Sequence, residues 1–321
     1  MNILEINKGE VAVGAQAKIV ALVKQAELKT WENANGKGEF MLYKFEDKTD
    51  AIGGIMFSPS GEAKEIKIGD LVRIEATVGT QKGRDELQLQ IDTRKGNKIV
   101  VDPTIDREEV MQSAPVPRAE MQAYIDAKIA EIENEDLKLI TTTVMGRMGK
   151  FFYEWPAAKV NHHAYLGGLA YHTSSMLKLA EGIMSVYPEG TFDRDLMFAG
   201  IILHDIAKVL EMSENGEYSI RGNLLGHLVM GSEIIDEVAI ENGLDPKSQK
   251  IMLLKHIILS HHGKLEWGSP VAPRIIEAEI IHYIDNIDAK VNMIIPATDK
   301  VPNGSLSAKI FGLDNRQFLK H

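Results

Sequence analysis

The hydrophobic period of the chain changes near residue 102, and this change limits the fold more than any other feature of the sequence. Between residues 14 and 92, short apolar stretches alternate with turn residues, a pattern typical of strands. After residue 118, apolar residues recur at spacings of three and four, which is typical of helices. We therefore predict a multidomain chain, in which an all-β barrel precedes an all-α domain.

The boundary between the domains is marked by prolines. Residues 102–118 contain three prolines and acidic residues and show little periodicity, so this segment is expected to be a linker. The barrel domain would then cover residues 1–101 and the helical domain residues 119–321. Helices are expected over 121–132, 137–148, 166–184, 196–210, 224–239, 249–259 and 275–287.

The first domain resembles an OB-fold, a small barrel that binds single-stranded nucleic acids. Its strands are expected over 15–28, 39–46, 51–57, 71–79 and 86–92, and five strands of this length suit a closed barrel. In the second strand, Met41, Tyr43 and Phe45 share one face and should fill the barrel. Phe40 and Lys44 share the other face, where they could bind bases together with Trp31 of the first loop. The alternative is that both aromatic residues merely pack under loops.

Composition limits the chemistry of the chain. It has no cysteine, so disulfides, cysteine-ligated zinc and thiol nucleophiles are excluded, and a metal would need histidine and carboxylate ligands. The net charge of −10 argues against one broad basic surface for nucleic acid, and residues 102–321 account for the whole deficit. Since no apolar segment is long enough to span a bilayer, we expect a cytoplasmic protein without a membrane partner.

The histidines are concentrated in the second half of the chain. None of the ten occurs before His162, and several lie within apolar helical sequence. Burial of the adjacent His204 and Asp205 is costly unless a metal compensates both groups. A lone histidine on an apolar face is more often a satisfied core residue than a ligand. A series on successive helices reverses this expectation, and the members of the series are His172, His204, Asp205, His227, His256, His261, His262 and Asp285.

The order His172, His204-Asp205, Asp285 resembles the HD superfamily of metal-dependent phosphohydrolases, and the HDIAK sequence resembles that family's HDxxK element. Together with the OB-like domain, it resembles the YhaM family of 3′-to-5′ exoribonucleases over nearly the whole chain. The resemblance implies an HD-type helical domain with two divalent ions, of which Mn²⁺ is favoured over Mg²⁺ or Fe²⁺. It assigns one ion to His172, His204, Asp205 and Asp285, with Asp205 as the bridge to the second.

The residues leave alternatives open for the ligands of the second ion. His227 and His261 are the preferred ligands, with His256 as the competitor and His262 as a further alternative. Asp288 is the alternative to Asp285 for the first ion. His163 and His282 are expected to be structural, and the terminal His321 has no assigned role. The His-His pair also resembles cyclic-dinucleotide hydrolases of the superfamily, but the sequence after it lacks their Gly-Tyr-Pro element.

The resemblance implies hydrolysis of phosphodiester bonds by metal-activated water, and imidazole and carboxylate ligands suit the metals that this chemistry needs. Asp205 and Lys208 are the catalytic candidates, with Lys208 supplying positive charge to the phosphate; alternatively, it is a surface lysine. The resemblance implies a 3′-to-5′ exonuclease that degrades single-stranded RNA, and DNA as a second substrate, to nucleoside 5′-monophosphates. A homo-oligomer is a separate expectation. The alternatives are a small-nucleotide phosphohydrolase with a regulatory barrel and a nucleic-acid-binding protein with a silent HD domain.

Overall fold

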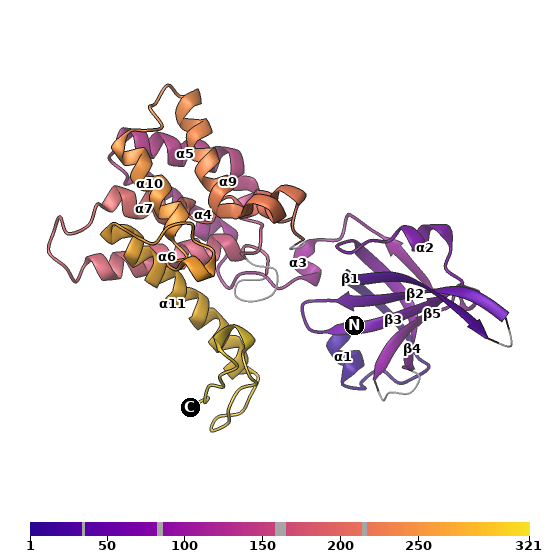
Figure 1. Ribbon diagram of the computed structural model, residues 1–321. Helices are drawn as coiled ribbons and strands as arrows, with labels where there is room; N and C mark the ends of the chain where they lie inside the picture. Colours follow the sequence, from indigo (N-terminus) through magenta and orange to yellow (C-terminus); the bar gives the residue numbers. More distant parts are fainter. Residues whose placement is uncertain (34–35, 82–85, 158–164, 214–216) are drawn as a thin grey trace. The chain divides into compact units, whose positions relative to one another are not determined.

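A computed structural model describes residues 1–33, 36–81, 86–157, 165–213 and 217–321. The chain divides into two compact units, Met1–Gln112 and Ser113–His321. The first contains the strands and the second contains the long helices, so the predicted fold class is confirmed (Figure 1). None of the helices in these ranges combines the length and the apolarity that crossing a membrane requires.

The first unit is a closed five-stranded barrel with one additional strand. The strands are β1 (Gln16–Asn33), β2 (Gly36–Glu46), β3 (Ala51–Phe57), β4 (Leu71–Thr80), β5 (Leu87–Ile91) and β6 (Lys98–Val101). Their order is β1-β2-β3-β5-β4, and β1 closes the barrel by pairing with β4 as well as β2. The pair β3–β5 is parallel and the other pairs are antiparallel. This is the OB-fold expected from the sequence; β6, which pairs with the edge of β4, was not predicted.

The interior of the barrel follows the predicted alternation in β2. Met41, Tyr43 and Phe45 are buried, and the Tyr43 hydroxyl donates a hydrogen bond to the Ala63 carbonyl at 2.8 Å. Two short helices, α1 (Ile3–Asn7) and α2 (Gly61–Glu65), add apolar residues to this core. Each fully buried large apolar side chain stabilises the domain by about 1.5–3 kcal/mol relative to exposure.

The expected linker 102–118 is in large part folded. It contains α3 (Arg107–Val110), which begins after the capping residue Asp106. Ile105 and Val110 are buried in a cluster with Leu22 and Leu71 of the barrel. The segment up to Gln112 therefore belongs to the first unit, because its apolar residues have a barrel surface on which to pack.

The second unit is a helical domain built around α7. Its helices are α4 (Arg118–Ala130), α5 (Glu135–Phe152), α6 (Gly168–Met184), α7 (Arg194–Leu203), α8 (Lys208–Glu211), α9 (Ile220–Glu241), α10 (Gln249–Ser260) and α11 (Ile276–Asp299). Every residue from Leu196 to Leu203 is buried, and α7 contacts α4, α5, α6, α10 and α11. A helix that is apolar on all sides is stable only when other helices surround it.

Two helices differ from the predicted bounds in ways that matter for the site. The expected helix 196–210 is interrupted, because α7 ends at Leu203 and α8 begins at Lys208, with His204 and Asp205 between them. The expected helix 224–239 begins earlier, at Ile220, and has a break at Gly226, where φ is 70° and ψ is 160°. Glycine adopts this positive φ without the penalty other residues incur. Both irregularities lie next to candidate ligands.

Candidate metal centre

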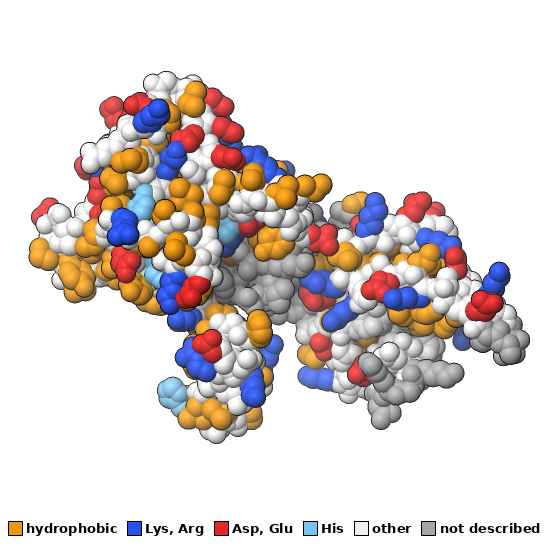
Figure 2. Space-filling model, viewed as in Figure 1, with side chains coloured by type: hydrophobic (Ala, Val, Ile, Leu, Met, Phe, Trp, Pro, Cys, Tyr) orange, Lys and Arg blue, Asp and Glu red, His pale blue; other side chains and the backbone are white. Residues whose placement is uncertain are grey.

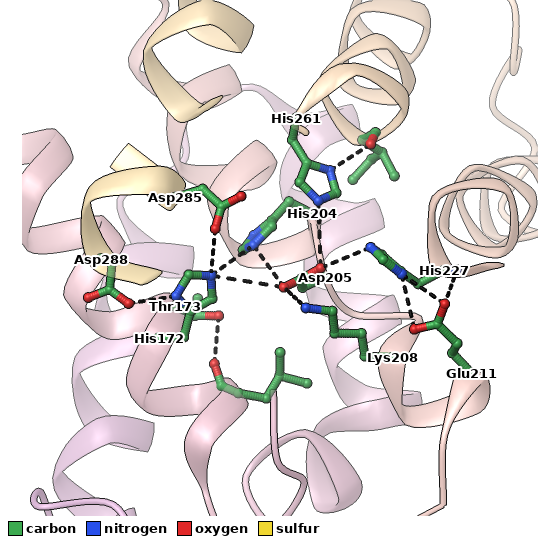
Figure 3. A network of polar contacts seen from close by, with 12 residues as sticks. His172, Thr173, His204, Asp205, Lys208, Glu211, His227, His261, Asp285 and Asp288 are labelled. Atoms are coloured by element: carbon green, nitrogen blue, oxygen red, sulfur yellow. Dashed lines mark hydrogen bonds and ion pairs between the residues drawn. The ribbon is translucent and has the colours of Figure 1, made fainter. Parts of the chain in front are cut away.

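The structure brings most of the predicted ligands together in the middle of the helical domain (Figure 3). Each element contributes its ligands at one place: α6 contributes His172, the turn after α7 contributes His204 and Asp205, α9 contributes His227, the end of α10 contributes His261 and His262, and α11 contributes Asp285. Two groups have ligand atoms within 4.8 Å of one another, namely His172, His204 and Asp205, and His227, His261 and His262.

Asp205 lies between the two groups and directs one carboxylate oxygen toward each. Its Oδ2 is 3.2 Å from Nε2 of His204 and 3.9 Å from Nε2 of His172. Its Oδ1 is 3.3 Å from Nε2 of His227 and 3.6 Å from Nε2 of His261. The side chain is 4% exposed. A carboxylate that faces two imidazole groups in this way is suited to bridge two metal ions.

The imidazole rings are oriented by contacts of Nδ1, the ring nitrogen other than Nε2. Nδ1 lies 2.7–3.0 Å from an oxygen in each case: Asp288 for His172, the Ile201 carbonyl for His204, Glu211 for His227, the Ile258 carbonyl for His261 and the Trp267 carbonyl for His262. With Nδ1 held by an acceptor, Nε2 is the atom left for a metal. Asp285 completes the first group, since its Oδ1 is 3.3 Å from Nε2 of His172.

Two buried atoms indicate that a cation belongs in this cluster. Asp205 Oδ1 and His227 Nε2 are buried and make no hydrogen bond to any part of the chain that the structure describes. Leaving such atoms unsatisfied costs about 1–3 kcal/mol each, and more when the group is charged. A divalent ion between them would satisfy both, and nitrogen and oxygen donors of this kind suit Mn²⁺, Mg²⁺ or Fe²⁺.

Lys208 is part of the centre and is not a surface residue. Its Nζ lies 2.7 Å from Oδ2 of Asp205, and its side chain is only 13% exposed. Burial opposes the charge on this lysine, but the neighbouring Asp205 carboxylate raises its pKa. Burial likewise opposes ionisation of Asp205, yet Lys208 and His204 hold its pKa well below the usual value. The pair therefore stays ionised at neutral pH.

His172 and His261 differ in protonation in the absence of metal. Burial acts to lower the pKa of His172, but its contacts with Asp285 and Asp288 outweigh this effect and raise the pKa to about 9. Burial lowers the pKa of His261 to about 3. A proton on His172 thus supplies positive charge beside the carboxylates, and a metal ion bound by its Nε2 would replace this proton.

His256 is not brought into the cluster. Its Nε2 accepts a hydrogen bond from the Arg274 backbone at 2.9 Å, so this nitrogen is engaged outside the centre. His256, the expected competitor of His261, lies in the middle of α10, whereas His261 directly follows its last residue. His262, the other alternative, does face His227 and His261.

Glu211, which orients His227, was missed from the sequence. It is 7% exposed, and its carboxylate also accepts a hydrogen bond from the His227 backbone at 3.0 Å. The signal was an acidic residue within apolar sequence, three positions after Lys208. Asp288, considered as a replacement for Asp285, instead holds the far nitrogen of His172.

The remaining histidines have the following places. His282 is buried, and its Nδ1 lies 3.0 Å from the His261 carbonyl, consistent with a structural role. His321 is exposed at the C-terminus. His163 lies outside the residues that the structure describes.

The barrel residues predicted to bind bases share one outer face. Trp31 pairs with Gly38 across β1 and β2, and Phe40 and Lys44 follow on the same side of β2. Trp31 and Phe40 are half-buried, while Lys44 is exposed. Phe57 pairs with Phe40 from β3, with ring centroids 5.8 Å apart, and is 56% exposed; the sequence analysis did not identify it.

A groove adjoins these aromatic residues. Its volume is about 440 Å³, and its lining includes Leu42 and Phe57 together with the cations Arg94 and Lys95 and the Asp92 carboxylate, which pairs with Arg94. Apolar and aromatic side chains next to cations are the features that proteins use to hold single-stranded nucleic acid.

Comparison with known proteins identifies the family. Residues 169–290 match the HD domain family. The chain is 37% identical over 312 residues to the 3′-5′ exoribonuclease YhaM of Bacillus licheniformis and 36% identical over 310 residues to that of Bacillus pumilus, in both cases over 96% of each chain. The OB domain of a Thermoplasma acidophilum protein is 18% identical, with a TM-score of 0.25, over 30% of this chain and 85% of that one. From its two relatives and the HD domain within it, the chain belongs to the YhaM family of 3′-5′ exoribonucleases.

Proposed function

We propose that the chain is a metal-dependent 3′-to-5′ exonuclease that hydrolyses single-stranded RNA to nucleoside 5′-monophosphates. The observation that supports this most strongly is the position of Asp205, buried between two groups of imidazoles with one unsatisfied oxygen. The relatives that share nearly the whole chain are named 3′-5′ exoribonucleases. Single-stranded DNA is proposed as a second substrate, because stacking on aromatic side chains does not depend on the sugar.

The proposed metal content is two ions per chain, with Mn²⁺ favoured. His172, His204, Asp205 and Asp285 would hold the first. Asp205, His227 and His261 would hold the second, with His262 beside them. Such ions supply positive charge for the phosphate oxygens and lower the pKa of water enough to generate a nucleophile near neutral pH.

The chain's own residues prepare this site in three ways. Asp288 and Glu211 fix the rings of His172 and His227, so that Nε2 of each ring points inward. Lys208 holds the Asp205 carboxylate and places an ammonium group where a phosphate oxygen can meet it. The apolar core next to the centre lowers the local dielectric constant, which strengthens these electrostatic interactions.

The barrel is proposed to bind the RNA strand and to take no part in the chemistry. It has no histidine, whereas its outer face presents Trp31, Phe40, Phe57 and Lys44 beside a groove. Stacking of each base on an aromatic ring contributes about 1–3 kcal/mol and is largely independent of sequence. A strand-binding face of this kind favours a polymer over a free nucleotide as substrate.

The cytoplasm is the proposed location, because a chain without cysteine needs no oxidising compartment. A homo-oligomer is the proposed assembly. Exposed apolar residues at spacings of four along α11, namely Ile287, Val291 and Ile295, support it, because adjacent exposed apolar residues favour association.

The experiment that tests the proposed function follows a single strand labelled at its 5′ end. With Mn²⁺, we expect labelled RNA to shorten stepwise from the 3′ end with release of nucleoside 5′-monophosphates, and we expect EDTA to stop the reaction. A matched duplex and free nucleotides serve as controls for the substrate class. Internal cleavage, or hydrolysis confined to free nucleotides, would contradict the proposal.

A further inference from the structure

A second groove lies in the helical domain, between α4 and α5, and has no part in the metal centre. Its volume is about 600 Å³, within the range of pockets that bind small ligands. Twelve residues line it, all from α4, from α5 or, in the case of Tyr153, from the position directly after α5. None of them is a ligand of the proposed metals, so the groove is a separate feature of the domain.

The charged residues of the groove favour an anion. Arg118, Lys138 and Lys150 contribute three cations, and Asp126 contributes one carboxylate. Arg118 also pairs with Glu154 at 2.6 Å, and the Lys138 ammonium donates to the Ala130 carbonyl at 2.8 Å. Lys150 is exposed at the end of α5. The cations thus remain in excess in a domain whose overall charge is negative.

Tyr153 provides an independent sign that a ligand is missing. Its side chain lines the groove and is 5% exposed, yet its hydroxyl has no hydrogen-bond partner in the described ranges of the chain. Burial raises the pKa of this phenol, so the hydroxyl keeps its proton and acts as a donor. A buried donor without an acceptor is costly, and phosphate oxygens are strong acceptors.

The other lining residues match the rest of a nucleotide. Ile129 and Met145 are buried in the groove and give an apolar surface on which a base can pack. Asp126 is an acceptor suited to ribose hydroxyls. Gly146 leaves open space on the α5 side, since a Cβ there would meet no atom within 4 Å.

We propose that the α4–α5 groove binds a nucleoside monophosphate, with Tyr153 donating to the phosphate and Lys150 neutralising it. The ligand is either the free nucleotide or one nucleotide of an RNA strand, since both present the same phosphate and base. The inference does not depend on the proposed nuclease activity, because it concerns binding at residues remote in sequence from the metal ligands.

The test is calorimetric titration of the full chain with adenosine 5′-monophosphate in the presence of EDTA. We expect one saturable site, about tenfold weaker binding in Tyr153→Phe, and clearly weaker binding in Lys150→Glu. Lys247→Glu, an exposed lysine of the same domain outside the groove, is the control for charge and should leave affinity within about twofold. Tighter binding of hexaadenylate that depends on the same two residues would also support the site and assign it to a strand.

Three results would overturn the proposal. One is the absence of saturable binding, and another is unchanged affinity in Tyr153→Phe. The third concerns stability without ligand. Because the hydroxyl has no partner among the described residues, its removal should not lower the melting temperature, so a markedly less stable Tyr153→Phe would show that the hydroxyl already has a structural partner.

Discussion

Replacement of Asp205 by asparagine separates the catalytic role of this residue from its structural one. The amide keeps the size of the side chain but removes the negative charge that both imidazole groups face at 3.2–3.9 Å. Loss of a residue that merely orients a ligand costs about 10–100-fold in metal affinity or activity. Since Asp205 would contact both ions directly, we expect Asp205→Asn to lower the rate of RNA degradation by at least about 1000-fold, or about 4 kcal/mol.

The same substitution also affects stability, through Lys208. Its side chain is only 13% exposed, and its ammonium would lose the carboxylate that lies 2.7 Å away. Breaking a buried pair costs about 3–5 kcal/mol, and the lower end applies because the lysine side chain is not fully buried. Urea unfolding in EDTA should therefore show a loss of about 3 kcal/mol for Asp205→Asn.

A double variant and a control variant separate the loss of the Asp205–Lys208 pair from the loss of activity. Asp205→Asn combined with Lys208→Met removes the unpaired charge, so the free energy of unfolding should recover while activity stays lost. Asp236→Asn breaks a partly exposed pair with Lys255 in the same domain and should cost about 1 kcal/mol with activity intact. Near-normal activity of Asp205→Asn with metal bound would refute the bridging role.

Three further predictions concern the ligands, the pH dependence and the barrel. His261→Ala should lose most activity and about one metal ion per chain by elemental analysis, whereas His256→Ala should keep its metal, since its Nε2 is bound to the Arg274 backbone. In metal-free protein, protonated His172 contributes fully to the free energy of unfolding below pH 6.5, and this contribution is lost as pH rises through about 9. Neutral His261 contributes above pH 6.5, and its contribution is lost as pH falls through about 3. Melting temperatures in EDTA should therefore peak near pH 6.5, and a steady rise from pH 6.5 to 9 would contradict these assignments. Phe57→Ala should weaken RNA binding by about 1–3 kcal/mol in a filter-binding assay while hydrolysis of a small phosphodiester continues; unchanged RNA affinity would remove Phe57 from the proposed surface.

The fold was predictable because each domain follows one hydrophobic period. Alternation in β2 placed Met41, Tyr43 and Phe45 inside the barrel, as the structure has them. The extent of the linker was not predictable in this way, because Ile105 and Val110 belong to no periodic apolar pattern. They are buried only against a barrel surface that residues distant in sequence form.

The site was predictable to the level of residue type and order. Histidines in apolar sequence indicated the centre. The direction of each imidazole ring, however, depends on helix breaks that periodicity does not reveal, such as the one at Gly226 beside His227, where φ is positive. The hydrogen bond of His256 could not be predicted from the sequence for a related reason. Its partner, the Arg274 backbone, is distant in sequence and could only be found in the folded chain.

We expect this cluster to bind metal and the degradation of RNA to require the bound metal. The most direct test titrates metal-free protein with Mn²⁺ and measures bound metal per chain and the rate of degradation of single-stranded RNA in the same samples. We expect no degradation without metal, and a rate that rises as bound Mn²⁺ approaches about two per chain, with both lost in Asp205→Asn. Degradation of RNA at the full rate by the metal-free chain would contradict this expectation.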